Sequence, residues 1–263
     1  MTIAYKDKIT TDNRAMLSLS AALMLSIFLA FTAHAEPLEV SADNQLLWDQ
    51  TKSLYQADGN AIAKRGTQEI AAQTLTAYYD DEADSLDITR ILAEENVRFA
   101  DGDMKGSGQN LDYDIALDRY DLQGPKAVII SKDGEVRADK TVLFERQKGM
   151  IYLRGNGYIQ LNDGRLLQGD EIDITLDEAE DIQTVAAKGD VFISQADGRQ
   201  ANANEGIYDA KTGKAILTGN VKIKDGESIL NGQKAEIDFN SGISRLLASE
   251  KGGRVSGILV DTQ

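Results

Sequence analysis

Residues 219–223 read Gly-Asn-Val-Lys-Ile, and this stretch decides the fold because related copies of it recur along the chain. In each copy a Gly-Asn pair, or a variant of that pair, precedes a short alternation of apolar and polar residues. Successive copies start 36, 29, 31, 34 and 30 residues apart, so the sequence repeats itself about every 30 residues. The six copies begin at Gly59, Glu95, Gly124, Gly155, Gly189 and Gly219.

A turn signal follows each start at a similar offset. Five copies carry Asp-Gly there, as at residues 163–164, and the first carries Arg-Gly at residues 65–66. Glycine accepts the positive φ that tight turns require, so these pairs predict hairpins. A second strand follows, and residues 172–176 show its apolar–polar alternation with a period of two. A third short strand, such as residues 215–218, leads into the next Gly-Asn pair, so each unit is predicted as β-turn-β-turn-β.

These units predict an all-β protein built from about six antiparallel repeats. No segment shows helical periodicity, and the chain contains only two prolines, so the strands are rarely interrupted. From the residues alone a sandwich, a barrel, a jelly roll and a solenoid all stay open. The units follow one another without a break. This favours one elongated domain, spanning residues 36–263, rather than two domains.

The first 35 residues have the order of a secretory signal peptide. Lys6, Lys8 and Arg14 precede an uncharged, mainly apolar run, and small residues end the segment at Ala35. The alternative is an uncleaved membrane anchor. The apolar run of residues 16–31 is shorter than the ~20 residues that span a bilayer, which favours cleavage. We therefore predict a signal peptide at residues 1–35 that is cleaved between Ala35 and Glu36.

The composition excludes several kinds of chemistry. The chain has 263 residues, no Cys, a single His at position 34 and a formal charge of −15. Cleavage removes three basic residues, two acidic residues and that His, so the remaining chain carries −16. Without Cys or His there is no Ser-His-Asp or Cys-His catalysis and no zinc or haem site of the usual ligands. The negative charge argues against nucleic acid as a partner.

Two carboxylate clusters, at residues 80–82 and 177–181, are the remaining candidates for an acid–base pair or a calcium site. Both fall at predicted turns, and neither has the ligand spacing of a calcium loop. We interpret them as solvated charge. The sequence therefore predicts no catalytic residue, no metal, no cofactor and no enzymatic activity.

Three segments and the repeats together resemble the OstA/LptA family. The segments are residues 37–43, with the sequence Pro-Leu-Glu-Val-Ser-Ala-Asp, residues 72–80 and the closing residues 252–260. The resemblance covers essentially residues 36–260. It implies a periplasmic lipopolysaccharide-transport protein with an elongated, twisted, open β-jellyroll. Such a protein holds the acyl chains of lipopolysaccharide in an apolar groove, stacks head to tail, and joins an LptC-like inner-membrane partner to an LptD-like outer-membrane partner.

Alternation of apolar and polar residues selects the candidate groove residues. Val97 and Phe99 share one face of a strand, with Arg98 on the other. By itself such alternation favours a closed sandwich core, whereas the resemblance implies a groove that admits lipid chains. The candidate groove-lining residues are Val97, Phe99, Leu111, Tyr113, Val128, Ile130, Val142, Phe144, Ile159, Leu161, Ile172, Ile174, Leu176, Val191, Ile193, Val221 and Ile223.

Open sheets end in strands with unpaired backbone groups, and these explain how such proteins could stack. We expect the two edges at residues 38–47 and residues 254–260. Because the chain and lipopolysaccharide phosphates are both negative, we expect recognition through the acyl chains, with head groups left in solvent. Three other functions stay open: an inner-membrane-anchored LptC-like component, a β scaffold that binds no lipid, and a carboxylate-dependent enzyme acting on polysaccharide.

Overall fold

The computed structural model describes residues 37–80, 87–248 and 254–260. The predicted signal peptide and its cleavage between Ala35 and Glu36 lie outside the described residues, so both stay predictions. Among the described residues, no helix is long and apolar enough to cross a membrane.

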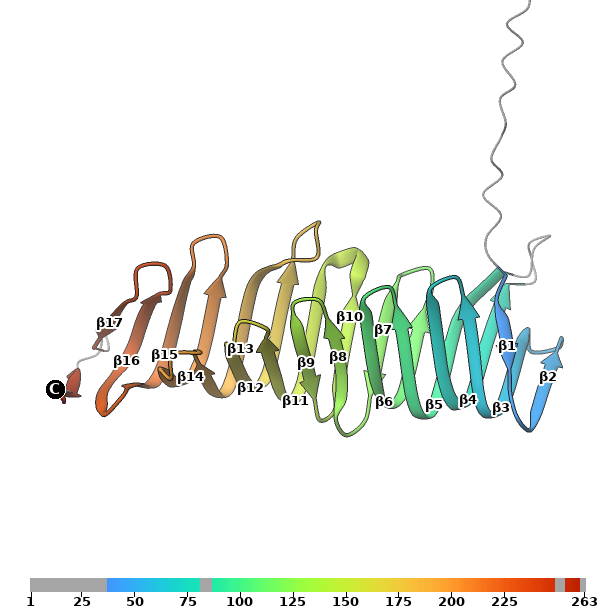
Figure 1. Cartoon of the computed structure of the whole chain (residues 1–263), viewed down its shortest axis with the longest axis horizontal. Helices are drawn as coiled ribbons and strands as arrows, with labels where there is room; N and C mark the ends of the chain where they lie inside the picture. Colours follow the sequence, from blue (N-terminus) through green and yellow to red (C-terminus); the bar gives the residue numbers. More distant parts are fainter. Residues whose placement is uncertain (1–36, 81–86, 249–253, 261–263) are drawn as a thin grey trace, which may run out of the picture. The chain divides into compact units, whose positions relative to one another are not determined.

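Antiparallel strands make up nearly all of the described structure, which confirms the all-β prediction (Figure 1). One short 3-10 turn, η1 (Arg146–Lys148), joins two of them. The strands are β1 (Glu39–Ser41), β2 (Gln45–Asp49), β3 (Leu54–Arg65), β4 (Gln68–Asp80), β5 (Asp87–Asp101), β6 (Met104–Asp114), β7 (Arg119–Gln123), β8 (Ala127–Ser131), β9 (Gly134–Ala138), β10 (Thr141–Glu145), β11 (Met150–Leu161), β12 (Leu166–Leu176), β13 (Ile182–Ser194), β14 (Gln200–Asp209), β15 (Lys214–Asp225), β16 (Ser228–Asp238), β17 (Ile243–Leu247) and β18 (Ser256–Ile258).

The Gly-Asn pairs lie inside long strands, which corrects the expected β-turn-β-turn-β unit. In β11, Gly155 and Asn156 face the single residue Asp170 of β12, and pairing resumes on both sides. Both bulge residues have positive φ, 78° and 53°. Two consecutive left-handed residues bend a strand without ending its hydrogen-bond ladder. At these starts the third strand of one unit and the first strand of the next are therefore one long, bent strand, whereas around Gly124 the strands β7–β10 stay short and separate.

The same two-against-one bulge occurs in five strands at the predicted repeat starts. A side chain from the bulge holds the bend in several copies. For example, the Asn156 amide donates to Asp139 at 2.7 Å, and the Asn60 amide donates to Asp43 at 2.8 Å. The bulged pairs are Gly59-Asn60, Glu95-Asn96, Gly155-Asn156, Gly189-Asp190 and Gly219-Asn220.

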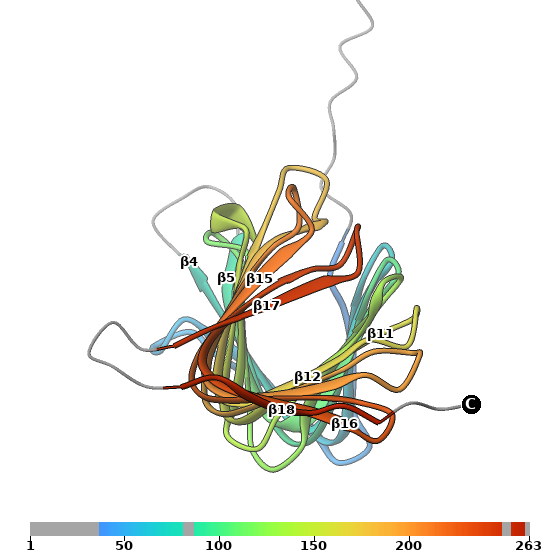
Figure 2. The same cartoon turned by 90° about the vertical axis from the view of Figure 1, so that its left-hand side faces the viewer.

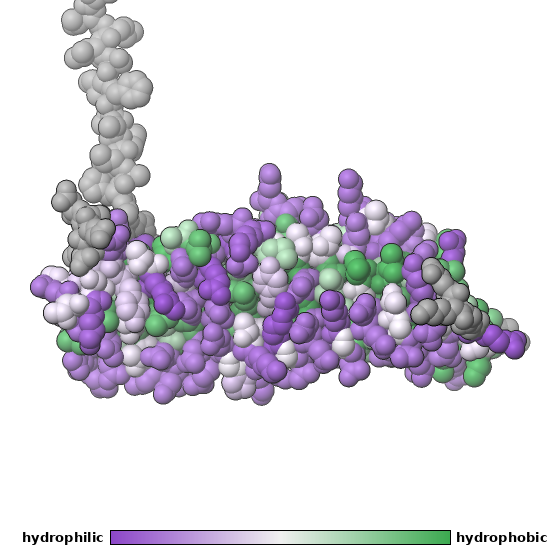
Figure 3. Space-filling view, turned by 180° about the vertical axis from the view of Figure 1, so that it is seen from behind, coloured by the Kyte–Doolittle hydropathy of each residue, from purple (hydrophilic) through white to green (hydrophobic). Residues whose placement is uncertain are grey.

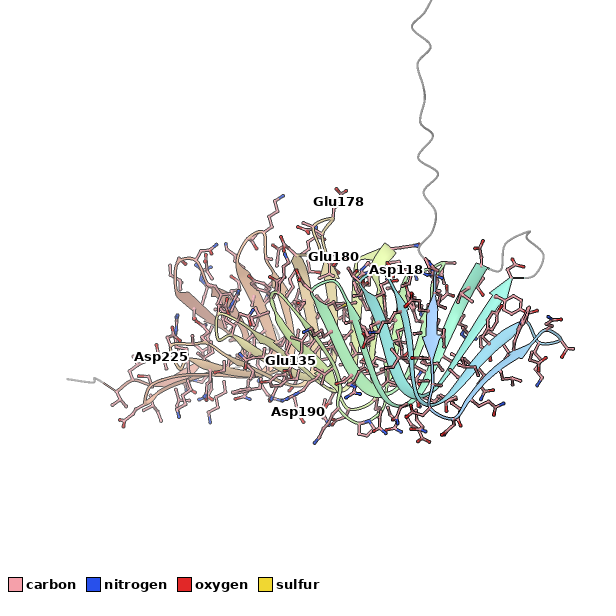
Figure 4. The ribbon with its side chains drawn as sticks, turned by 45° about the vertical axis from the view of Figure 1, so that its right-hand side comes forward. Asp118, Glu135, Glu178, Glu180, Asp190 and Asp225 are labelled. Carbon is pink, nitrogen blue, oxygen red and sulfur yellow. The ribbon has the colours of Figure 1, made fainter. Side chains whose placement is uncertain are left out.

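The bulges fold the sheet into two walls. The first wall contains β2, β7, β10 and β17, and the second contains β1, β8, β9 and β18. The long strands β3–β6 and β11–β16 cross the line of bulges and contribute one half to each wall. Viewed along the stack, the strands curve round from one wall to the other (Figure 2). Asp190, in one of the bulges, therefore lies on the opposite side of the stack from Asp118 and Glu180 in the first-wall turns (Figure 4).

Apolar side chains fill the space between the walls, and charged side chains point outward. Val97 and Phe99 are 1% and 4% exposed, whereas Arg98 between them is exposed. Within the described residues, no polar or charged residue is classed as buried. The fold is thus an antiparallel β-jellyroll whose inner face is almost entirely hydrocarbon.

Candidate functional site

The inner face carries fifteen of the seventeen candidate groove residues. Twelve of them are buried, including Ile172 and Ile174. The other three, Leu161, Leu176 and Ile193, are partly buried and pack against the same core. The alternation pattern thus predicts the inward orientation of these fifteen side chains, and their contact with lipid stays a prediction.

The prediction is wrong for Val128 and Ile130, which point outward from β8. Ala127 and Ile129 take the inward positions and are 0% and 5% exposed, whereas Ile130 is 49% exposed. The reason lies in the corner that precedes this strand. The other copies have two residues in the bulge, but Pro125 extends this corner to three, with positive φ at Gly124 and Lys126. One extra residue moves every following side chain to the opposite face.

Among the described residues three hollows open along the inner face, and a larger one, of about 380 Å³, opens on the outer side of the second wall. The largest of the inner hollows, of about 190 Å³, lies between β11–β16 and is lined by Ile159, Leu161, Leu167 and Ile193. A second, of about 100 Å³, extends from Met104 and shares three lining residues with the first, so the two are contiguous. A third, between β1 and β3–β7, holds only about 30 Å³. The shared lining residues are Ile159, Leu161 and Ile182.

Tyr208, Phe239 and Leu167 also line the largest inner hollow, although sequence reasoning missed them. The first two continue an existing alternation, since Phe239 follows Ala235 and Ile237 at two-residue steps. Extending the alternation to the strand ends finds them. Leu167 gives no such signal, because its neighbour Leu166 is also apolar.

Hydrophobic side chains also reach the surface along this groove. They gather on the face seen in Figure 3, most densely over the half of the stack nearest the C-terminal strands. The lining of the largest inner hollow contains one charged side chain, Arg165, whose guanidinium pairs with Asp163 at 2.7 Å. The largest inner hollow therefore offers a ligand hydrocarbon contact and a single paired cation, whereas the lining of the second hollow also includes Asp133, Glu135 and Glu180.

One cluster of charged groups crosses from wall to wall. Arg146 of η1, on the first wall, donates to an Asp101 oxygen at 2.8 Å, and Asp101 ends β5 on the second wall. The Tyr120 hydroxyl donates to the same oxygen at 3.0 Å. Burial opposes ionisation of Asp101, but the hydrogen bonds from Arg146 and Tyr120 outweigh it and lower the pKa of the carboxyl. The contact is therefore a charge-assisted bridge between the two walls.

The acidic cluster at residues 177–181 makes a turn and two ion pairs. An Asp177 oxygen accepts hydrogen bonds from the backbone N–H groups of Ala179 and Asp181. Glu180 pairs with Arg146 at 3.0 Å, and Asp181 pairs with Lys132 at 3.3 Å. Throughout the part of the chain that the structure describes, no three His, Cys, Asp or Glu side chains gather as metal ligands. Of the other cluster, residues 81–82 lie outside the described ranges.

Comparison with known proteins identifies relatives of this fold. A family model described as "LptA/(LptD N-terminal domain) LPS transport protein" matches residues 39–149 and 135–243. Seventeen chains of solved structures match. One is LptH, the LptA homologous periplasmic component of the conserved lipopolysaccharide transport device from Pseudomonas aeruginosa, with 10% identity. The match covers 86% of this chain and 96% of that one, with a TM-score of 0.22. No curated protein matches.

Proposed function

Because the chain belongs to the LptA and LptD N-terminal-domain family of lipopolysaccharide transport proteins, we propose that it binds lipopolysaccharide by its acyl chains. In this proposal it forms part of a bridge that carries the lipid from the inner to the outer membrane. The observation that carries the proposal is the apolar groove between the two walls.

Burial of hydrocarbon is enough to hold such a ligand. Each CH₂ group removed from water contributes about 0.8 kcal/mol, so several acyl chains bind without a charged anchor. The remaining chain carries −16, which disfavours close contact with phosphates. The proposal therefore leaves the phosphorylated head group in solvent at the mouth of the groove.

The two ends of the stack support the bridge. Among the described strands, β1 and β2 pair with β3 alone, and β17 and β18 pair with β16 alone. Each end thus offers two edge strands with free backbone groups. Pairing of unlike ends extends the stack head to tail and continues the groove from one subunit to the next.

Partners and location follow from the same proposal. An LptC-like protein at the inner membrane and an LptD-like protein at the outer membrane would present compatible edges to the two ends. The predicted cleavage after Ala35 would release the protein into the periplasm. N-terminal sequencing of the protein from cells tests this point. If residues 16–31 are retained in the protein, the LptC-like alternative is favoured instead.

Photocrosslinking in cells tests the lipid. A photoreactive amino acid at Ile193, on the wall of the largest inner hollow, should crosslink to lipopolysaccharide. The same photoreactive amino acid at Lys222, on the outer face, should give no crosslink to lipopolysaccharide. Absence of any lipid crosslink from Ile193, in a protein shown to be folded and exported, would favour the scaffold that binds no lipid.

A further inference from the structure

The wall-to-wall bridge is the most buried group of charges between the walls. The Arg146 side chain is 24% exposed and that of Asp101 is 16% exposed. Asp118 and Glu180 also approach the guanidinium, at 3.4 Å and 3.0 Å, and both come from first-wall turns (Figure 4). Three carboxylates already balance the positive charge of Arg146, so this side chain is not available to bind a phosphate. Its geometry suits it to tie the walls together.

A stack of aromatic rings lies beneath this bridge. Phe99 of the second wall stacks on Tyr120 of the first wall, with ring centroids 5.5 Å apart. Tyr120 also stacks on Tyr113 at 4.2 Å and approaches Phe144 at 6.2 Å. All four rings are at most 7% exposed, and the Arg146 guanidinium lies 5.3 Å from the Phe144 centroid. Rings from both walls therefore fill the groove at this level from side to side.

The hollows on the two sides of these rings differ in size. On the N-terminal side the hollow of about 30 Å³ has room for roughly one water molecule. On the C-terminal side the contiguous hollows hold about 100 Å³ and about 190 Å³. An apolar cavity of about 150 Å³ accommodates benzene, so the C-terminal side has room for a segment of alkyl chain. The two sides share no lining residue.

We propose that the four rings and the Arg146–Asp101 bridge form a partition that confines bound acyl chains to the C-terminal compartment. The partition comprises Phe99, Asp101, Tyr113, Tyr120, Phe144 and Arg146. A lipid that moves along the groove past β7 must break the bridge and displace the rings. This inference rests on the proposed function, and it adds where the lipid sits and which residues control its passage.

The test is photocrosslinking of the purified protein, without its signal peptide, to purified lipopolysaccharide. A photoreactive residue is placed at Leu167 or Ile193 on the C-terminal side, and at Leu38 or Ile115 on the N-terminal side. All four positions are partly buried on the inner face, so the substitutions are comparable. The crosslinking yield at the C-terminal positions should be about tenfold higher than at the N-terminal positions, which corresponds to a difference of about 1.4 kcal/mol in binding free energy.

Two variants then open the partition. Arg146→Met keeps an unbranched apolar stem and removes the guanidinium with its charge, and Asp101→Asn removes the charge from the other wall. Each should raise crosslinking at Leu38 and Ile115 by about fivefold, the effect of roughly 1 kcal/mol. Arg90→Met is the control, because it breaks an exposed pair with Asp112, at 2.7 Å, on the outer face. Its crosslinking pattern should match that of the unmodified protein.

The outcomes separate the inference from the proposed function. Equal crosslinking on both sides of the rings would overturn the partition and leave lipid binding intact. No crosslinking at any of the four positions would contradict lipid binding itself. A strong C-terminal preference that neither Arg146→Met nor Asp101→Asn relaxes, in variants with an unchanged near-ultraviolet circular dichroism spectrum, would overturn the role of the bridge.

Discussion

At the scale of single residues, the left-handed backbone at the bulges restricts which residues can occupy them. Gly155 has a φ of 78°, and an added Cβ would meet the Lys140 side chain. The second bulge position is Asn or Asp, which tolerate left-handed backbone, in all five bulges. Glu95 shows that the first position does not strictly require glycine, at a cost in backbone energy.

Replacement of Gly155 by alanine should destabilise the protein by about 1–2 kcal/mol, because left-handed backbone costs that much for a residue with a Cβ. The melting temperature should fall by about 2–8 °C, measured by circular dichroism. Gly169 in the neighbouring strand is the matched control. Its φ is not in the left-handed region, and an added Cβ would meet only ordinary contacts at 3.4–3.5 Å. An equal loss in Gly169→Ala would show that close packing, and not φ, selects glycine.

The Asp101→Asn variant should change how stability depends on pH. The folded-state pKa of Asp101 lies below its ordinary value of 3.8, so its carboxylate stabilises the fold above that pH. This contribution disappears as the pH falls through the lowered pKa. In urea unfolding we expect the variant to be less stable by about 1–3 kcal/mol at pH 7, and the difference to shrink at pH 3.

Asp103→Asn, in the exposed turn next to Asp101, is the control for that experiment. It should leave the free energy of unfolding nearly unchanged at both pH values. A constant difference between the Asp101 variant and the unmodified protein across this pH range would mean that the carboxylate charge does not stabilise the bridge.

The sequence predicts the orientation of most groove residues because a period of two needs only the local strand. It fails at Val128 and Ile130. Pro125 adds one residue to the corner before β8, and residues 127–130 are all apolar, so their pattern does not show which side chains face inward. It also does not reveal that Arg146 meets Asp101, because that contact joins two walls and residues 45 positions apart. Such contacts follow from the bend, which the local pattern does not contain.

At the scale of elements, a Gly-Asn pair has two structural meanings. Two-residue hairpin turns and these bulges both require positive φ at successive residues, so the same dipeptide suits either. From the sequence alone, the pair is interpreted as the gap between two short strands. The structure instead continues the strand, because residues on both sides of the pair stay registered with one partner strand. The number of repeats is predicted correctly and the number of strands per repeat is not.

The edge strands carry exposed apolar side chains that suit the proposed stacking. The predicted N-terminal edge, residues 38–47, overlaps β1 and β2, and the predicted C-terminal edge, residues 254–260, contains β18. The predicted edges do not include β17, the C-terminal edge strand of the first wall. Leu47 in β2 is 40% exposed and Ile243 in β17 is 61% exposed.

Leu47→Lys and Ile243→Lys should each weaken self-association by about tenfold or more, since each places a charge at an apolar contact. Sedimentation velocity over a range of protein concentrations measures this. Ile216 and Ile207 supply matched controls, because they are 42% and 57% exposed on β15 and β14, which have a partner strand on each side. If lysine at these control positions weakens association equally, the proposed end-to-end contact is wrong.

At the scale of the whole molecule, the net charge of the protein repels the anionic head group of the lipid, whereas the apolar groove favours binding of its acyl chains. The chain without residues 1–35 carries −16, so its long-range field repels phosphate. Added salt screens that repulsion and strengthens the burial of hydrocarbon slightly.

Affinity for lipopolysaccharide should therefore stay constant or rise by up to about threefold when NaCl increases from about 0.05 M to 0.5 M. Equilibrium binding of fluorescent lipopolysaccharide measures it. A protein that anchors the phosphates with cations loses affinity over the same range. A steep fall here would place the head group against Lys and Arg side chains and contradict recognition through acyl chains.

The recurring bulge also sets how such a protein can vary in length. A complete unit, such as residues 189–218, adds two antiparallel bent strands to the stack. It therefore lengthens both walls by roughly 10 Å. Insertion of a single strand would keep all neighbours antiparallel, but it would place two bulged strands or two unbulged strands side by side and break the two-against-one pairing. Growth or loss of the molecule during evolution is thus confined to whole increments, and the reach of each subunit is a multiple of one modular step.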